Sequence, residues 1–200
     1  MGSKDRIQRI KDKIYNAILD AAMGILKSEG CEALSIRKIA DKIEYSAPVL
    51  YSYFLNKEDL LIELSKRGFS KLVNCIEQSL LGLTSPKERL ESMLLAHITF
   101  ARKESELYQL MYSVGIHVSD VMETFPVLTK IGNIFRRELL GKSNGQVISE
   151  DSFRERYLTY LSFAHGLASL NLYFKDIDFT TNLEIAKNAA LGIFCPEPVA

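Results

Sequence analysis

The chain contains 200 residues, 47% of them hydrophobic, and its 25 basic and 25 acidic side chains give a formal net charge of zero. This length allows one large or two small domains with a substantial core. Zero net charge argues against a protein that coats nucleic acid, although a sequence-specific DNA-binding protein needs only a local basic face. The first thirteen residues carry five basic and two acidic side chains, a charge of +3 that fits either such a face or a solvated, frayed terminus.

Cysteine usage and the lack of long apolar runs point to a cytoplasmic protein. The three cysteines are odd in number and have no metal-type spacing, which fits a reduced compartment. We interpret Cys31, Cys75 and Cys195 as buried or incidental, the alternative being a redox-sensing thiol. The N-terminus lacks the apolar segment of a signal peptide, and no run of about 18 uncharged apolar residues exists to span a membrane. We therefore expect cytoplasmic localisation and no membrane partner.

The first two predicted helices follow from apolar spacing and capping residues. Apolar residues at helical spacing from Ile14 to Leu26 predict a helix that ends before Gly30. Ser35 is placed to cap the next helix, since its hydroxyl can accept an amide hydrogen of the first turn. Apolar side chains then recur on one face as far as Ile43, while charged side chains occupy the other face.

A third, short helix follows a turn at Glu44 and Tyr45. Ser46 is placed to cap it, and Pro48 suits its first turn because the missing amide costs nothing there. The predicted helix, Ala47–Tyr53, is too short to be stable alone. Two helices joined by a tight turn are typical of a helix-turn-helix, whose second helix enters the DNA major groove. The alternative is a small helical subdomain that uses the same caps for packing alone.

The rest of the chain is also predicted to be helical. Ser85 and Glu88 form a capping box with proline at the first helical position. Pro126 is expected to interrupt or kink a later helix. No stretch of alternating polarity suggests a strand, so we predict an all-α protein. The expected helices span residues 57–81, 85–101, 105–114, 119–140, 150–174 and 181–194.

The helix-turn-helix resembles that of the tetracycline-repressor (TetR) family of transcriptional regulators. The resemblance is carried by Ser35–Ala40, Tyr45–Ser46, Leu50–Phe54 and Lys57 with Leu60. It implies an N-terminal three-helix DNA-binding domain over residues 1–56 and a C-terminal helical bundle for ligand binding and dimerisation over residues 57–200. One departure is Glu44, where the family usually has glycine; a left-handed conformation there costs roughly 1–2 kcal/mol.

The resemblance also implies a function. The protein is expected to be a ligand-responsive regulator, in the commoner mode a repressor, that binds a palindromic double-stranded DNA operator as a homodimer. It is expected to need no cofactor and to catalyse no reaction. Arg37 can bridge guanine O6 and N7, and small apolar side chains can meet a thymine methyl. Phosphate contacts would fix the register, although the tyrosines have packing within the head as an alternative. The residues that the motif places at the DNA are Ser35, Arg37, Ser46, Ala47, Pro48, Val49, Tyr51, Tyr53 and Lys57.

The C-terminal half contains many aromatic and methionine side chains on several predicted helices. The segment from Phe163 to Leu170 resembles the His-Gly region of one TetR subgroup, which usually has tryptophan where Phe163 stands. Such a bundle can enclose a small apolar or aromatic effector held by a few polar groups. The alternative for each residue is an ordinary core position. The candidate ligand-binding residues are Met93, His97, Phe100, Tyr108, Met111, Tyr112, Phe163 and His165.

Other functions have weaker support in the sequence. His97, His117 and His165 are too widely separated to form a recognisable metal site. No nucleophile with a base, glycine-rich phosphate loop or pair of carboxylates indicates catalysis. Two alternatives to the regulator are a helical ligand-binding or scaffold protein whose head no longer binds DNA, and a small all-α enzyme that uses His165 or His97 as a base.

Overall fold

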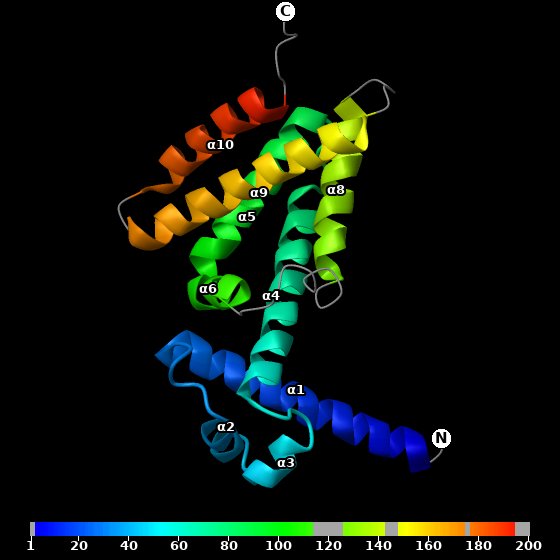
Figure 1. Ribbon diagram of the computed structural model, residues 1–200, viewed down its shortest axis with the longest axis vertical. Coiled ribbons are helices and arrows are strands. Elements are labelled where there is room, and N and C mark those ends of the chain that lie inside the picture. Colours follow the sequence, from blue (N-terminus) through cyan, green and yellow to red (C-terminus); the bar gives the residue numbers. More distant parts are fainter. Residues whose placement is uncertain (1–2, 114–125, 143–147, 175–176, 195–200) are drawn as a thin grey trace, which may run out of the picture. The chain divides into compact units, whose positions relative to one another are not determined.

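The computed structural model describes residues 3–113, 126–142, 148–174 and 177–194, and within these ranges the regular structure is entirely helical (Figure 1). The all-α prediction is therefore confirmed. His117 and Cys195 lie outside the described residues. The helices are α1 (Ser3–Glu29), α2 (Ile36–Lys42), α3 (Ala47–Tyr51), α4 (Lys57–Ser79), α5 (Pro86–Lys103), α6 (Ser105–Ser113), α8 (Val127–Lys142), α9 (Glu150–Tyr173) and α10 (Phe179–Phe194).

The chain divides into two compact units. Unit 1 contains the described residues up to Gly68 together with Glu106 to Ser113, and unit 2 contains the remainder. The predicted domain boundary between residues 56 and 57 coincides with the beginning of α4. The compact units instead divide within α4, and unit 1 takes in nearly all of α6.

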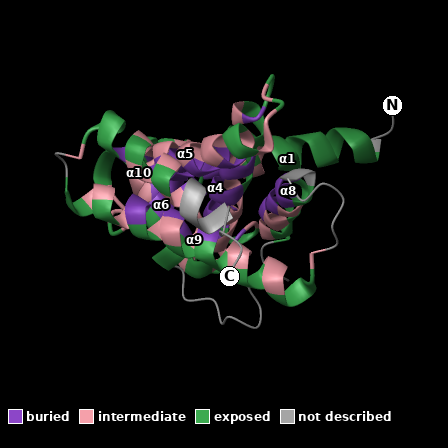
Figure 2. Cartoon of the chain, turned by 90° about the horizontal axis from the view of Figure 1, so that it is seen from above, coloured by how far each residue is buried: buried purple, intermediate pink, exposed green. Residues whose placement is uncertain are grey.

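The core of unit 1 is built on the apolar face of α1. Ile18 and Leu26 of α1 are buried with Ile39 of α2, Leu50 of α3 and Leu60 of α4. Figure 2 colours the chain by burial and shows buried residues along α4. Helix α2 packs against both α1 and α3. The two short helices α2 and α3, which are individually unstable, are thus held in place by one apolar cluster shared with α1 and α4.

Polar contacts also join α1 to α4 within unit 1. The Tyr15 hydroxyl donates a hydrogen bond to Glu63 at 2.7 Å, and the Tyr15 ring stacks on Phe54 with ring centroids 5.4 Å apart. Burial, and then the Glu63 carboxylate, raise the pKa of Tyr15 above its ordinary value. Arg67 pairs with Asp20 at 2.6 Å. These contacts fix the direction in which α4 leaves the core of unit 1.

Gly68 allows α6 to pack closely on α4. A Cβ atom at position 68 would lie 2.6 Å from the Met111 sulfur and 3.2 Å from a methyl carbon of Leu107. These distances are shorter than van der Waals contact, so a larger side chain at position 68 requires the Met111 side chain to move. Gly68 is thus a point of close approach between α4 and α6.

Unit 2 is organised around α5, which packs against α8, α9 and α10. Tyr160 of α9 lies fully buried between Phe135 of α8, whose ring centroid is 5.2 Å away, and His97 of α5. Helices α9 and α10 are joined by two reciprocal amide hydrogen bonds of 2.8 Å between Asn171 and Asn182. Each buried amide therefore satisfies the other.

Candidate nucleic-acid interface and ligand groove

The turn between α2 and α3 is closed by backbone hydrogen bonds. The Ser35 hydroxyl caps α2 by accepting from the Lys38 amide at 3.2 Å. At the other end, the Tyr45 amide donates to the Ala40 carbonyl at 3.0 Å and the Glu44 amide donates to Asp41 at 3.3 Å. This pair of bonds is a Schellman motif, which requires a left-handed residue just beyond the helix. Glu44 is that residue, with φ of 59°.

Helix α3 is anchored by a single side chain. Of its five residues, only Leu50 is buried. Ser46 takes the N-cap backbone position, but its hydroxyl makes no capping hydrogen bond, in contrast to the sequence interpretation. The helix ends at Tyr51 rather than at the predicted Tyr53. Beyond it, the Tyr53 and Phe54 amides both donate to the Leu50 carbonyl, and Phe54 is buried.

The predicted DNA-contacting residues occupy the surface of α2, the turn and α3. The structure places all nine at exposed or half-buried positions, as DNA contact requires. Arg37 is exposed on α2, and Tyr51 on α3 keeps 50% of its surface accessible. The remaining exposed residues are Ser35, Ser46 and Pro48, and the half-buried ones are Ala47, Val49, Tyr53 and Lys57.

Lys57 has a role that the sequence did not suggest. Its ammonium group donates to the Cys31 carbonyl at 3.4 Å, and thereby joins the first turn of α4 to the loop before α2. The preceding residue, Asn56, caps α4 by accepting from the Asp59 amide at 2.8 Å, as predicted. The lysine is thus held at the surface of the head by one of its three donors, which leaves two for another partner.

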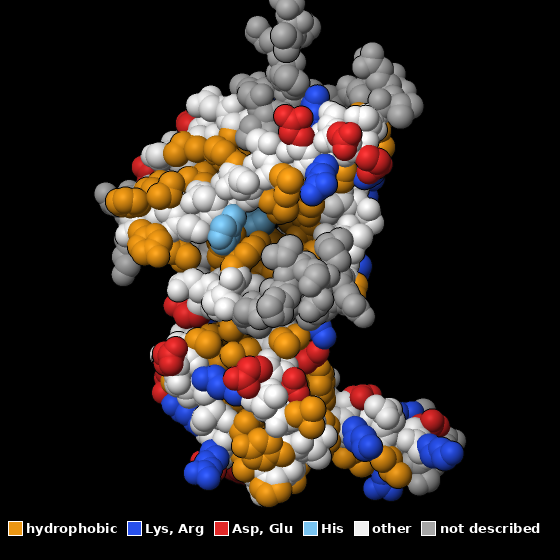
Figure 3. All heavy atoms as spheres, viewed as in Figure 1, with side chains coloured by type: hydrophobic (Ala, Val, Ile, Leu, Met, Phe, Trp, Pro, Cys, Tyr) orange, Lys and Arg blue, Asp and Glu red, His pale blue; other side chains and the backbone are white. Residues whose placement is uncertain are grey.

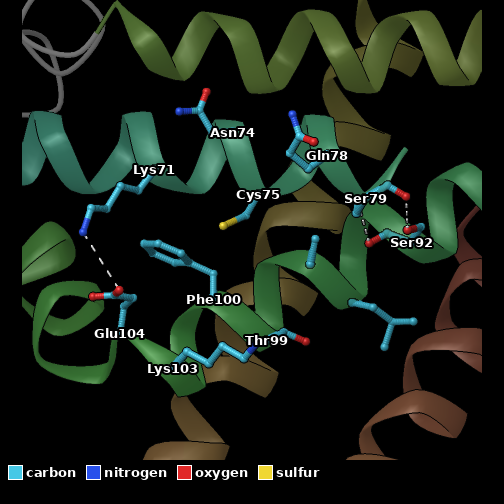
Figure 4. Close-up of a pocket in the computed structure, with 12 residues that line it drawn as sticks. Lys71, Asn74, Cys75, Gln78, Ser79, Ser92, Thr99, Phe100, Lys103 and Glu104 are labelled. Atoms are coloured by element: carbon cyan, nitrogen blue, oxygen red, sulfur yellow. Dashed lines mark hydrogen bonds and ion pairs between the residues drawn. The ribbon is translucent and has the colours of Figure 1, made fainter. Parts of the chain in front are cut away.

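A groove with a volume of about 670 Å³ lies between α4 and α5 in unit 2 (Figure 4). Cys75 and Phe100 extend into the space between the helices, while Asn74 and Gln78 lie at the edge and point away from α5. The groove is lined by Lys71, Asn74, Cys75, Gln78, Ser79, Ser92, Leu95, Ala96, Thr99, Phe100, Lys103 and Glu104.

Charged and polar groups are distributed unevenly along this groove. Lys71, Lys103 and Glu104 lie towards the end of α5, where the Lys71 ammonium is 3.9 Å from Glu104. At the other end, the Ser92 hydroxyl donates to the Ser79 carbonyl at 2.8 Å, which holds the helices together. The groove therefore has a charged end with two cations and one carboxylate, an apolar middle and a hydrogen-bonded closed end.

The predicted ligand-binding residues lie in several places. Phe100 lines the groove. Met93 and His97 are fully buried on α5 and do not line the groove, and Phe163 and His165 are half-buried on α9. The remaining three lie on α6, in unit 1, where two are buried and one is exposed: Tyr108, Met111 and Tyr112.

The groove residues form two helical stripes that sequence reasoning overlooked. On α4, polar or small residues recur every three or four positions from Lys71 to Ser79, and on α5 they recur from Ser92 to Lys103. Small side chains on facing helices leave space between them. The two stripes, one on α4 and one on α5, are therefore the sequence feature that predicts the groove. The predicted ligand-binding residues were aromatic and methionine side chains instead, and most of these are buried in the core.

His97 and Tyr160 form the buried polar pair of unit 2. The His97 Nδ1 atom lies 3.3 Å from the Tyr160 hydroxyl. Burial, with a smaller effect from the charge of His165, lowers the pKa of His97 to about 3. His97 is therefore neutral at physiological pH.

Among the described residues no group of three or more potential ligands is arranged to hold a metal ion. No helix in the described part of the chain is long and apolar enough to cross a membrane.

Comparison with known proteins gives a family match for part of unit 1 and a relative that matches nearly the whole chain. Residues 18–64, from within α1 to the first turns of α4, match the family described as bacterial regulatory proteins, tetR family. The activator FasR of Mycolicibacterium smegmatis is 29% identical over 51% of this chain, but the matching part is about half of FasR, 47%. The repressor KstR of Mycobacterium tuberculosis is 25% identical over 96% of this chain and 84% of its own length.

A solved structure resembles this chain in fold over both units. The transcriptional regulator FadR from Bacillus subtilis, solved in complex with stearoyl-CoA, superposes with a TM-score of 0.70 over 90% of this chain and 98% of its own, at 18% identity. The family match ends at residue 64 and so does not bear on the resemblance around His165 and Gly166. The helix-turn-helix of this chain thus forms within a segment that matches the tetR family of bacterial regulatory proteins, which supports a DNA-binding transcriptional regulator.

Proposed function

We propose that this protein is a homodimeric transcriptional repressor that binds a palindromic operator and releases it when an amphipathic acyl compound binds unit 2. The observation that carries the proposal is the closed turn between α2 and α3, which leaves Arg37, Pro48 and Tyr51 exposed on one anchored motif. A helix-turn-helix of this kind delivers the start of its second helix to the major groove.

The exposed residues divide into two groups by chemistry. Arg37 reads guanine through its two-pronged guanidinium, and Ala47, Pro48 and Val49 contact thymine methyl groups. Hydroxyl and ammonium groups bind phosphate and fix the register of the head on the duplex. The residues in this second group are Ser35, Ser46, Tyr51, Tyr53 and Lys57.

Exposed apolar side chains on α9 and α10 support dimerisation. Leu170, Tyr173, Phe174 and Phe179 keep between 48% and 83% of their surfaces accessible. An exposed group of this size near the joint between two helices is characteristic of an interface. Leu167 of α9 is buried within the chain and is not part of this exposed group. Two-fold pairing of such subunits requires an operator with matching two-fold symmetry.

The groove between α4 and α5 is the proposed effector site. Its volume lies within the range of small-molecule sites, about 300–1,000 Å³. Phe100, Leu95 and Ala96 suit a hydrocarbon chain, and Lys71 with Lys103 suit an anionic head group. The structurally similar FadR binds stearoyl-CoA, which has both features. We therefore choose a long-chain acyl compound rather than an aromatic one.

The effector would act through α4. Groove residues Lys71 and Cys75 belong to this helix, whose earlier part carries Glu63 and Arg67, the partners of α1. A ligand that prefers a different separation of α4 and α5 shifts the population toward that conformation. The shift is limited to the difference between the ligand's affinities for the two conformations.

The test begins with selection of bound fragments from the source genome, followed by fluorescence anisotropy on the selected duplex. A palindromic sequence bound with steep salt dependence supports the proposal. Stearoyl-CoA and stearate then serve as probes: the expected result is release of the duplex by one of them. Failure to select any sequence would overturn the DNA-binding function, whereas selection without release would overturn only the effector assignment.

A further inference from the structure

Helix α1 begins well before the core that it supports. Every residue from Lys4 to Lys13 is exposed, and complete burial begins only at Ile18. At 1.5 Å per residue, residues 3–13 form a helical segment about 16 Å long. We call residues 3–13 the α1 extension; in Figure 1 it projects past α3. The sequence left open whether this part is frayed, and the structure shows a helix from Ser3 onward.

The α1 extension has a regular distribution of side chains. Residues seven apart lie on the same side of a helix. Ile7 and Ile10, 52% and 47% exposed, begin an apolar stripe that Ile14 continues. One side of this stripe carries Lys4 and Lys11, the other carries Arg6 and Lys13, and the opposite face carries Asp5 and Asp12. Figure 3 shows basic and apolar side chains together along this projecting part.

We propose that the α1 extension is a second DNA-contacting element, which lies against the duplex beside the base pairs read by α3. Two rows of cations on either side of an apolar stripe match the two phosphate backbones that border a groove. A helix about 10–12 Å wide cannot enter a minor groove about 6 Å wide, so it lies over the groove with one cation row at each backbone. The acidic residues are on the far face, which keeps negative charge away from the phosphates.

The α1 extension is continuous with the helix-turn-helix domain, which favours DNA over other binding partners for it. The extension is the same rigid helix that packs on α2, and α2 in turn packs on α3. The alternative surface is an anionic membrane, which amphipathic basic helices also bind. Two exposed isoleucines without an aromatic residue provide little apolar area for that purpose. The inference rests on the proposed DNA-binding function.

The experiment measures the salt dependence of operator binding by the full-length protein. One variant removes the first cation row, Lys4→Gln with Lys11→Gln, and another removes the second row, Arg6→Gln with Lys13→Gln. The control, Lys130→Gln with Arg154→Gln, removes the same charge from exposed positions on α8 and α9. Since each phosphate contact contributes about 0.9 to the slope of log K against log salt, each row variant should reduce the slope by about 2 per subunit, or about 3.6 for the bound dimer. The control should leave it unchanged.

The outcomes separate the possibilities. If the wild-type protein binds no operator, the proposed function fails. If it binds and both row variants retain its slope, the extension does not contact DNA and the inference is overturned. Co-sedimentation with phosphatidylglycerol vesicles is the second measurement. Binding that is lost in Ile7→Ser with Ile10→Ser, together with unchanged slopes, would assign the extension to a membrane instead. Circular dichroism of each variant verifies that the helix content is retained.

Discussion

The guanidinium of Arg89 holds the carboxylate of Glu138 through two hydrogen bonds, of 2.5 and 2.9 Å, and also donates to the carbonyls of Leu80 and Leu83. One side chain at the beginning of α5 therefore joins α8 to the end of α4. The Glu138 side chain is only 5% exposed. Burial alone raises its pKa, but hydrogen bonds from Arg89 and Arg137 outweigh this effect and lower it below the ordinary value.

Removing Arg89 alone should lower the free energy of unfolding far more than removing Arg89 and Glu138 together. Arg89→Leu leaves the buried carboxylate with only the exposed Arg137 as its donor, and leaves two carbonyls without the Arg89 donor. It should lower the free energy of unfolding by about 3–5 kcal/mol. The double variant with Glu138→Leu should recover a large part of this loss, because no uncompensated charge remains. Urea denaturation followed by circular dichroism measures both. Equal losses in the single and double variants would show that the carboxylate is not the cause.

Glu44→Gly should stabilise the protein. Glu44 has a positive φ, which costs a side-chain-bearing residue roughly 1–2 kcal/mol and glycine almost nothing. Glycine loses more chain entropy on folding, so the expected net gain is about 1 kcal/mol, or about 2–4 °C in Tm for a chain of this size. Glu44→Ala, which keeps the strain but removes the charge, is the matched control. Calorimetry should show no gain for alanine.

Arg37→Ala and Lys57→Ala should affect DNA binding differently. Loss of the Arg37 contact should cost roughly 1–3 kcal/mol at one base position in each half-site and relax specificity there. Loss of Lys57 should weaken binding to all sequences alike and reduce the salt slope by about 1. Because Lys57 also holds the Cys31 carbonyl, its variant should lose some stability as well. Wild-type affinity and slope in both variants would refute these assignments.

Protein stability should fall between pH 6.5 and pH 5. The pKa of His97 is lowered to about 3 in the folded protein, whereas an unfolded histidine titrates near 6.5. Below pH 6.5 the unfolded chain gains a proton that the folded chain does not, so the free energy of unfolding decreases with falling pH. The expected loss by pH 5 is about 2 kcal/mol. The free energy of unfolding of His97→Gln should depend less on pH in this range. Burial also lowers the pKa of His165, which leaves a residual dependence of the same sign.

A larger side chain in the groove should abolish the effector response without affecting DNA binding. Ala96 is half-buried at the floor of the groove, so Ala96→Phe fills space that a ligand would use. At a hundredfold excess over its Kd, a bound acyl compound should stabilise the wild-type protein by about 2.7 kcal/mol, and the variant by much less. Thr159→Phe, at an exposed position of α9, is the matched control. A full response in Ala96→Phe would place the effector elsewhere.

Local rules predicted the head better than the body. In the head, Ser35 caps α2 where the sequence placed it, because a hydroxyl at the first turn depends only on its neighbours. In the body, the capping box predicted at Ser85 is wrong: Ser85 takes the N-cap backbone position of α5, but its side chain makes no capping hydrogen bond. The ligand groove depends on which faces of α4 and α5 meet, a long-range property that one sequence does not define. The role of Gly68 has the same origin, since its partner Met111 is distant in the chain. For Tyr108 and Tyr112, aromatic character predicted a pocket, but the residues belong to α6 in unit 1.

The small buried area of α3 bears on how the protein can change over evolutionary time. Leu50 alone ties the helix to the core, so Ala47, Pro48, Val49 and Tyr51 contribute little to folding. Substitutions at these positions can alter the DNA sequence that is recognised while the head remains folded. A descendant of this gene could therefore acquire a new set of target promoters by a few point mutations, with no compensating change in the rest of the chain.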